Sequence, residues 1–421
     1  MVLMAAFVSI VFLYSLVSRR LERTVVTAPI LFTAAGALTV LLPLALSELA
    51  VDRKMLLMIA EVGLVMTLFT DASRINRRML KGNRNLPVRL LGIGMLPTIL
   101  LGAVCAMLVL GGLSWWEAGI LAAILAPTDA GLGQVIVTSQ RVPMRIRQAL
   151  NVEAGLNDGL SVPFLMFFIA LAEARDSTAG AGAVLTRFLG EQLGYGVVLG
   201  LGVGLAGGWL LGLAHRRAWM AEPLGQLGVV ALPLLCVIAS EATGASMFIA
   251  AFVAGLAAQA GFGEVGRKSV EFTEDWGQLF NFFVFFLFGL LVTRAWTQFS
   301  PAAVLYGLLS LTVIRMVPVA LALSGTGLSR PTVLFMGWFG PRGLASIVLG
   351  LVYLEQEVDL PGESTIRLAV MATVLLSILA HGLSALPGID LYVKRIASLG
   401  TDAPEYHAVE GVASNREGRT V

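Results

Sequence analysis

The stretch "APTDAGLG", residues 126–133, interrupts a long apolar run in the first half of the chain. A second stretch, "GWFGPRGLAS" at residues 337–346, interrupts an apolar run in the second half. Proline removes a backbone donor and glycine weakens a helix, so each stretch predicts a helix that is broken near its middle. Each break carries one ionisable side chain, Asp129 in the first and Arg342 in the second. Two such breaks, one in each half, indicate an internal repeat.

The composition around these breaks is typical of a membrane protein. The 421 residues have a mean hydropathy of +0.85 and only 13% are charged, whereas soluble domains contain about 25% charged residues. A membrane-spanning helix needs roughly 20 predominantly apolar residues. We therefore predict an all-α polytopic membrane protein with thirteen transmembrane helices, near residues 2–18, 26–46, 55–72, 87–111, 115–139, 147–172, 188–214, 223–241, 244–260, 276–293, 301–323, 331–354 and 366–386.

The number of spans sets the relation between the two breaks. Thirteen spans divide into six, one and six, which inverts the second six relative to the first and makes the fifth and twelfth spans correspond. Broken helices at matching positions of inverted repeats cross at a binding site near the bilayer midplane. We predict a transmembrane domain over 1–390, with repeat one, a linker helix and repeat two at about 1–173, 188–214 and 223–386, and then a short cytoplasmic tail at 391–421.

Lysine and arginine predict the orientation. They gather in the loops after odd-numbered spans, most densely in "SRINRRMLKGNRNLPVR" after the third span. Because cytoplasmic loops carry the excess of Lys and Arg, the N-terminus is predicted outside and the C-terminus in the cytoplasm. The expected location is the cell (inner) membrane, with membrane lipid as a partner.

The sixth span contains several side chains that are costly to bury, in "NVEAGLNDG" at 151–159. An ionisable residue deep in a span costs about 2.5–3.5 kcal/mol or more, so it usually faces a partner or a cavity. Ala154, Asn157 and Asp158 are spaced i, i+3, i+4 and share one helix face. Glu153 points about 140° away from Asp158 around the helix. Asp158 can therefore face the first break, whereas Glu153 needs its own partner.

Arg342 is the best available cation for Glu153, because it lies in the other broken helix. The sequence alone does not assign a partner to Arg315, which could neutralise Glu241 or another acid. A purely structural polar network is the alternative interpretation of the cluster around Glu153. His381, near the end of the last span, is predicted to be a packed or interfacial side chain rather than a pH sensor.

The first break offers oxygen ligands. Pro127 frees backbone carbonyls, Thr128 adds a hydroxyl and Asp129 adds charge. Such oxygens suit hard cations, although Asp129 could instead cap a half-helix. Asp71, at the predicted cytoplasmic end of the third span, could line a funnel toward this site. It could equally balance the charges of Arg74 and Arg77 at the membrane interface.

Together these residues resemble the bacterial NhaP-type sodium/proton antiporters of the monovalent cation/proton antiporter superfamily. The resemblance rests on "LFTDASRI" (68–75), "LAPTDA" (125–130), "NVEAGLNDG" (151–159), "GASMFIAAFVAGL" (244–256) and "GPRGLAS" (340–346). It implies a dimerisation domain, a moving core domain, a homodimer, and exchange of Na⁺ or Li⁺ for H⁺ by alternating access. It implies no enzymatic activity, no cofactor and no nucleic-acid partner.

The resemblance also implies roles for individual residues. Asp158 is the main ion- and proton-binding carboxylate, Asp129 and Thr128 join it as Na⁺ ligands, and Asn157 steadies the site. Asp71 lies nearby, the backbone carbonyl of Ala154 is a further ligand, and Glu153 and Arg342 form a structural ion pair. Relatives often carry serine where this chain has Ala154, which leaves the choice between Na⁺ and K⁺ open. The Asn-Asp pair at 157–158 implies electroneutral one-for-one exchange.

Two other functions are compatible with buried aspartates. A K⁺/H⁺ antiporter of the same fold is the closest alternative. An intramembrane aspartyl protease also uses two membrane aspartates, but its residues occur in Tyr-Asp and Gly-x-Gly-Asp contexts. Here they occur in Thr-Asp and Asn-Asp contexts, within a repeat that a protease does not need.

Overall fold

The computed structural model describes residues 2–21, 24–41, 53–74, 85–176, 182, 186, 190, 193–261, 266–355, 360–400 and 402–407. Within these ranges every regular element is a helix. Eight helices are long and apolar enough to cross a membrane, and four shorter apolar helices accompany them. The prediction of an all-α polytopic membrane protein is therefore confirmed.

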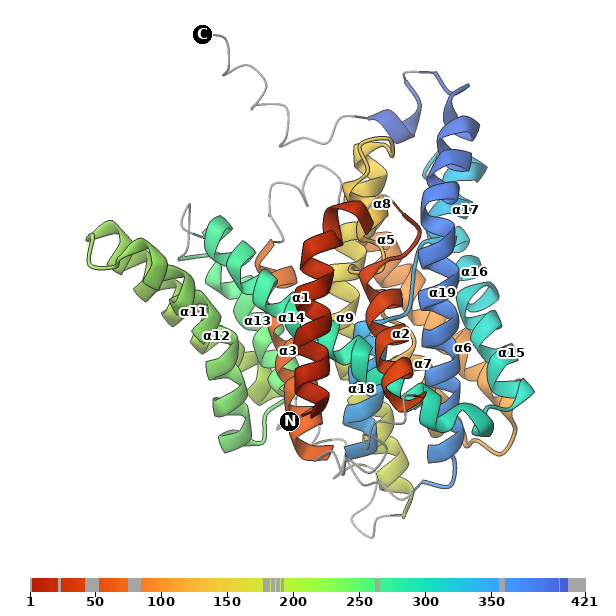
Figure 1. Cartoon of the computed structure of the whole chain (residues 1–421), viewed down its shortest axis with the longest axis horizontal. Coiled ribbons are helices and arrows are strands. Elements are labelled where there is room, and N and C mark those ends of the chain that lie inside the picture. The colour runs from red at the N-terminus through yellow and green to blue at the C-terminus, as the bar shows by residue number, and fades with distance from the viewer. Residues whose placement is uncertain are drawn as a thin grey trace.

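The helices follow the predicted spans in order, but the tenth begins at Gly266 rather than 276 and the last ends at Ile396 rather than 386. Figure 1 shows how they are arranged. Three predicted spans are each divided into two helices, namely the fifth, the eleventh and the twelfth, and a π-helical turn at Leu90–Gly94 interrupts the fourth. The helices are α1 (Val2–Leu21), α2 (Ala28–Leu41), α3 (Arg53–Arg74), α5 (Asn85–Arg89), α6 (Met95–Leu110), α7 (Trp115–Ile124), α8 (Gln134–Thr138), α9 (Met144–Asp176), α11 (Tyr195–Arg216), α12 (Glu222–Thr243), α13 (Met247–Ala258), α14 (Gly266–Ala295), α15 (Pro301–Leu311), α16 (Val313–Ala322), α17 (Arg330–Trp338), α18 (Leu344–Glu355) and α19 (Glu363–Ile396).

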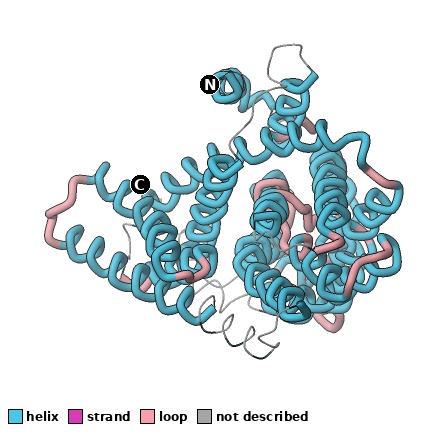
Figure 2. The backbone as a smooth tube through the Cα atoms, turned by 90° about the horizontal axis from the view of Figure 1, so that it is seen from below, coloured by secondary structure: helices cyan, strands magenta, loops and turns pink. Residues whose placement is uncertain are grey.

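The helices form two groups. Figure 1 places α11, α12 and α13 on one side and α15, α16 and α19 on the other, and Figure 2 shows the same separation after a 90° turn. In the first group α11 packs on α13, and α14 packs on α2 and α3. In the second group α7 packs on α6 and α9, and α15 packs on α19. The helices of the second group include both broken spans.

Small residues explain the tight packing in the first group. Every fourth residue of α11 from Gly196 to Gly212 is a buried glycine. A Cβ atom at Gly204 would collide with the backbone of Ala254 on α13. In a membrane, helices associate by such close backbone approach, because lipid offers no hydrophobic driving force between them. The glycines of α11 thus allow its backbone to approach α13 closely.

The second group contains a separate hydrophobic cluster at one end. Its buried side chains come from α5, α8, α9, α16, α17 and α19, and include Leu86, Ile136, Ile146, Phe335, Tyr392 and Ile396. α19 passes through the predicted domain boundary at 390 and ends at Ile396. A short 3₁₀ helix, η4, follows at Pro404–Tyr406, and Glu405 within it is buried. The start of the predicted tail is thus ordered and packed; residues beyond His407 lie outside the described ranges.

Candidate ion-exchange site

The two broken helices meet at their breaks. α7 ends at Ile124 and α8 begins at Gln134, while α17 ends at Trp338 and α18 begins at Leu344. The backbone N–H of Asp129 in the first break donates to the carbonyl of Pro341 in the second, at 2.8 Å. The predicted crossing is therefore confirmed.

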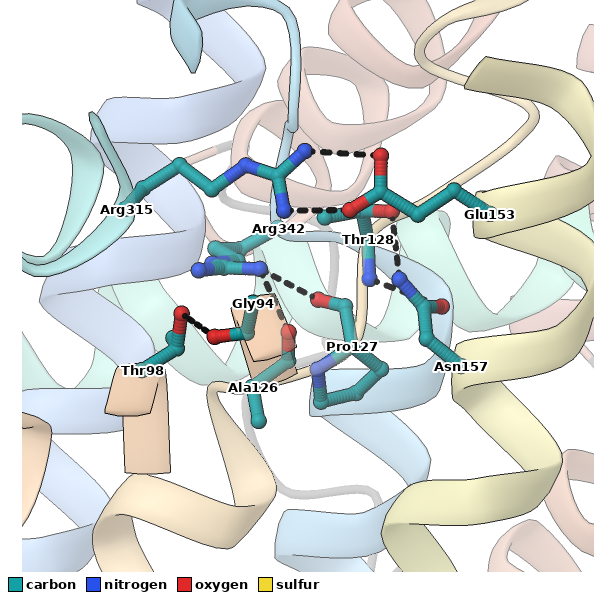
Figure 3. A network of polar contacts seen from close by, with 9 residues as sticks. All are labelled: Gly94, Thr98, Ala126, Pro127, Thr128, Glu153, Asn157, Arg315 and Arg342. Carbon is teal, nitrogen blue, oxygen red and sulfur yellow. Dashed lines mark hydrogen bonds and ion pairs between the residues drawn. The ribbon is translucent and has the colours of Figure 1, made fainter. Parts of the chain in front are cut away.

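Each break supplies one charged side chain to the other broken helix. The Asp129 carboxylate accepts the N–H of Leu344, the first residue of α18, and the N–H of Leu132 in its own break, at 2.9 Å for the latter. The Arg342 guanidinium donates to the carbonyls of Ala126 (2.7 Å) and Pro127 (2.9 Å), which follow the end of α7 (Figure 3). A helix N-terminus is electropositive and a C-terminus electronegative, so both contacts have the favourable sign. The predicted alternative, in which Asp129 caps a half-helix, is thus part of the observed geometry.

Two side chains of α19 complete the second break. Ser377 Oγ accepts the backbone N–H of Arg342 at 2.7 Å. His381 Nε2 lies 2.8 Å from the carbonyl of Trp338, the last residue of α17, and Nδ1 lies 3.1 Å from Ser377 Oγ. Nδ1 also lies 3.0 Å from the Ser377 carbonyl, so either ring nitrogen can donate to a carbonyl, and the tautomer decides which one does. His381 is 1% exposed, as expected of a packed histidine.

Asn157 connects α9 to the first break. The backbone N–H of Thr128 donates to Asn157 Oδ1 at 3.1 Å, and Asn157 Nδ2 donates to Thr128 Oγ1 at 2.7 Å (Figure 3). Both ends of the amide are therefore used, and the Thr128 hydroxyl hydrogen remains free to turn elsewhere. This geometry fixes the break relative to α9.

Two aspartates near the crossing hold buried oxygens without a hydrogen-bond partner in the described part of the chain. These atoms are Asp158 Oδ1 on α9 and Asp71 Oδ2 on α3. Asp158 is only 5% exposed, and Asp71 packs on α9 at Gly155, where an added Cβ would lie 3.2 Å from the Asp71 Cβ. Buried polar atoms are nearly always satisfied in native proteins. An orphaned carboxylate oxygen beside a crossing therefore indicates a place for a proton or a cation.

The predicted ion pair between Glu153 and Arg342 is wrong. Glu153 instead pairs with Arg315 on α16, through Nη1–Oε1 at 2.5 Å and Nη2–Oε2 at 2.9 Å (Figure 3). Arg342 donates through Nη1 to the carbonyls that follow α7. The prediction that Glu153 needs a partner separate from Asp158 is nevertheless right. A glycine in the second break reflects this pairing. A Cβ at Gly340 would collide with the Arg315 guanidinium, so the glycine leaves room for that side chain.

A small cavity lies between the breaks and α9. Its volume of about 20 Å³ is enough for one water-sized group. Its lining includes Thr128, Asp129, Glu153, Ala154 and Pro341. The structure thus brings three predicted ligand positions, Thr128, Asp129 and Ala154, to one cavity, with the Glu153–Arg315 pair at its edge. The contact of Ser377 with the second break could not be predicted from the sequence, because a serine in an apolar helix is common.

Gly343→Ala is expected to lower exchange at least about tenfold, since a shift of about 1 Å at a site can cost a hundredfold. A Cβ at Gly343 would overlap Asp129 Oδ2 and displace that carboxylate from the N–H of Leu344. Initial rates of ion-driven proton flux in proteoliposomes measure the effect. Gly350→Ala, on α18 just after this break, is the matched control, because the added Cβ there meets only Val370 at 3.4 Å. Equal rates in the two variants would contradict the capping role of Asp129.

Comparison with known proteins finds antiporters that are similar to this chain in sequence. A relative described as the K(+)/H(+) antiporter NhaP2 of Shewanella sp. (strain MR-4) is 27% identical over 286 residues, covering 65% of this chain and 46% of the relative. The Na(+)/H(+) antiporter of Schizosaccharomyces pombe is 26% identical over 259 residues, covering 55% and 53%. The chain spans about half the length of these curated relatives.

The fold has a solved counterpart. The sodium proton antiporter MjNhaP1 from Methanocaldococcus jannaschii superposes with a TM-score of 0.73 at 20% identity, over 94% of this chain and 98% of that one. The model of the family described as "sodium/hydrogen exchanger, transmembrane" matches residues 5–387. With this match the resemblance to NhaP-type antiporters is confirmed, and the chain belongs to the sodium/hydrogen exchanger family.

Proposed function

We propose that this integral membrane protein exchanges Na⁺ or Li⁺ for H⁺ by alternating access, one for one. The observation that carries the proposal is the buried Asp158 carboxylate, with an oxygen that has no partner among the described residues, next to two crossing helix breaks. A proton or a monovalent cation would neutralise it. The match to the sodium/hydrogen exchanger family and the similarity to the Na(+)/H(+) antiporter of Schizosaccharomyces pombe support the same activity.

The charges around the crossing leave carboxylates that a cation or a proton can neutralise. Glu153 is neutralised by Arg315, and Asp129 lies in the same crossing as Arg342. Asp158 and Asp71 remain without such a partner in the described structure. An empty, negatively charged site would be costly to move past an apolar barrier, whereas a loaded site is nearly neutral. Only loaded states would then switch sides, which produces exchange without a separate gate.

The proposed ligands are distributed over two elements. Asp158 supplies the main charge and Asn157 holds the break in place. Thr128, Asp129 and the Ala154 carbonyl add oxygens from around the small cavity. Both Asp129 oxygens accept backbone N–H groups, but each carboxylate oxygen has two lone pairs, so they can still contact an ion. Asp71 would supply charge on the approach to Asp158.

A K⁺/H⁺ antiporter is the second candidate. The relative from Shewanella carries that description, and Ala154 lacks the hydroxyl that relatives often place there. Fewer hard side-chain ligands would weaken discrimination in favour of the smaller Na⁺. We further propose a homodimer with the N-terminus outside and the C-terminus in the cytoplasm, which the distribution of Lys and Arg supports.

The exchange rate is expected to form a bell in pH whose acid limb moves to lower pH as Na⁺ rises. If a proton and one cation compete for Asp158, full competition moves that limb by about one pH unit per tenfold rise in Na⁺. Flux is measured in proteoliposomes with equal pH on both sides, at several concentrations of Na⁺, Li⁺ and K⁺. An acid limb that stays fixed over a hundredfold range of every cation would rule out simple competition.

A further inference from the structure

The first broken helix begins with a capping box. Ser114 Oγ accepts the N–H of Glu117 at 3.3 Å, and Glu117 Oε2 accepts the N–H of Ser114 at 2.7 Å. The other oxygen of Glu117 accepts the N–H of Gly362 at the start of α19, at 2.7 Å. This buried carboxylate therefore satisfies the backbone N–H groups at the N-caps of both α7 and α19.

The second broken helix lacks this arrangement in its own sequence. α17 also begins after a serine, Ser329, but the residue three positions later is Thr332 rather than an acid. The Ser329 side chain accepts no N–H of its own helix. A carboxylate is present nonetheless, because Glu405 Oε1 accepts the N–H of Ser329 and the hydroxyl of Thr332, each at 2.8 Å.

The segment around Glu405 is seated against three helices of the second group. Glu405 is 1% exposed. The carbonyl of Pro404 accepts from Arg145 Nη1 at 2.5 Å, near the beginning of α9. The Ile396 carbonyl at the end of α19 accepts from the Tyr406 hydroxyl at 3.4 Å. Residues 402–407 thus connect the first turns of α9 and α17, which are the two helices that lead to Asp158 and to the second break.

We propose that Glu405 completes the N-terminal cap of α17 from the far end of the chain, and is thereby a positioning residue for exchange. This inference rests on the proposed function. α17 has only nine residues, and such a short helix depends on its caps and its packing. A loss of the cap would loosen α17 and, through Trp338, the break that holds Arg342.

The charge on Glu405 persists through the neutral range. Burial raises the pKa of this carboxyl, but the hydrogen bonds from Ser329 and Thr332 outweigh burial and hold the pKa below its ordinary value. A lowered pKa contributes stability above the unfolded-state value, and this stability is lost as pH falls through the folded value. The cap is therefore constant around pH 7 and weakens only in acid.

The test exploits the missing acid of α17. Glu405→Ala is expected to lower the maximal exchange rate about tenfold and to lower the thermal-unfolding midpoint. The apparent KM for the cation should stay unchanged, and so should the shift of the acid limb with cation concentration. Adding Thr332→Glu to Glu405→Ala places the acid at the capping-box position of α17 itself, and should restore at least half of the lost rate and midpoint. Asp402→Asn, at an exposed aspartate of the same segment, is the control and should leave the rate and the midpoint unchanged.

Three outcomes would overturn the proposal: a wild-type rate and midpoint in Glu405→Ala, no recovery in the double variant, or a KM change as large as the rate change. If the parent protein exchanges none of Na⁺, Li⁺ and K⁺, the proposed function fails. In that case the unfolding midpoints of Glu405→Ala and the double variant still decide whether Glu405 caps α17.

Discussion

Asp158→Asn is expected to reduce cation-driven proton flux to that of empty liposomes, while the variant folds and is at least as stable as the parent. The carboxylate is buried and one of its oxygens has no partner among the described residues, so it contributes unfavourably to folding when ionised. An amide of the same size removes that charge. It also removes the main counter-charge for a cation and the group that would carry a proton.

Purified Asp158→Asn is compared with the parent in two measurements: flux in proteoliposomes and the thermal-unfolding midpoint in detergent. Asp275→Asn, an exposed aspartate on α14, is the matched control and should leave both unchanged. Wild-type flux in Asp158→Asn would refute the assignment of the site. Loss of flux together with a clearly lower midpoint would show that Asp158 is a structural residue instead.

The features of the fold that could be predicted are those that depend on local chemistry. Proline and glycine in an apolar run dictate a break, and two matched breaks dictate the crossing, so both followed from "APTDAGLG" and "GWFGPRGLAS". The separate faces of Glu153 and Asp158 followed from helix geometry alone. These inferences needed no knowledge of which helices are neighbours.

The partner of Glu153 could not be predicted in this way. Two arginines were available, and the choice between them depends on a bend at Thr312 that divides the eleventh span into α15 and α16. Arg342 instead donates to the carbonyls of Ala126 and Pro127, which lie in the first break after the end of α7. The contact of Glu405 with Ser329 could not be predicted either, because it joins residues that are 76 positions apart through a short tail segment.

Arg315→Ala is expected to be the most destabilising of these substitutions, by about 3–5 kcal/mol, because it leaves the Glu153 carboxylate buried without a counter-charge. Both side chains are nearly inaccessible, at 5% for Arg315 and 3% for Glu153. Solvent therefore cannot take over the role of the missing partner. The expected result is a low yield and a markedly lower unfolding midpoint, with any residual exchange retaining its ion preference.

A double-mutant cycle separates the observed ion pair from the alternative that the sequence first indicated. Removing Glu153 from the Arg315→Ala protein should recover much of the lost midpoint, since no unpaired carboxylate then remains. The same change in an Arg342→Ala protein should recover little, because the main loss there is the hydrogen bonds to Ala126 and Pro127. The pairing described above would be wrong if the effects of the Glu153 and Arg315 substitutions were additive while those of Glu153 and Arg342 were strongly coupled. The difference between the two cycles matters for the mechanism. If Glu153 and Arg315 neutralise each other, the ion-binding charge at the crossing belongs to Asp158 and its neighbouring aspartates. Cation affinity should then be retained when Glu153 and Arg315 are both replaced by uncharged residues of similar size.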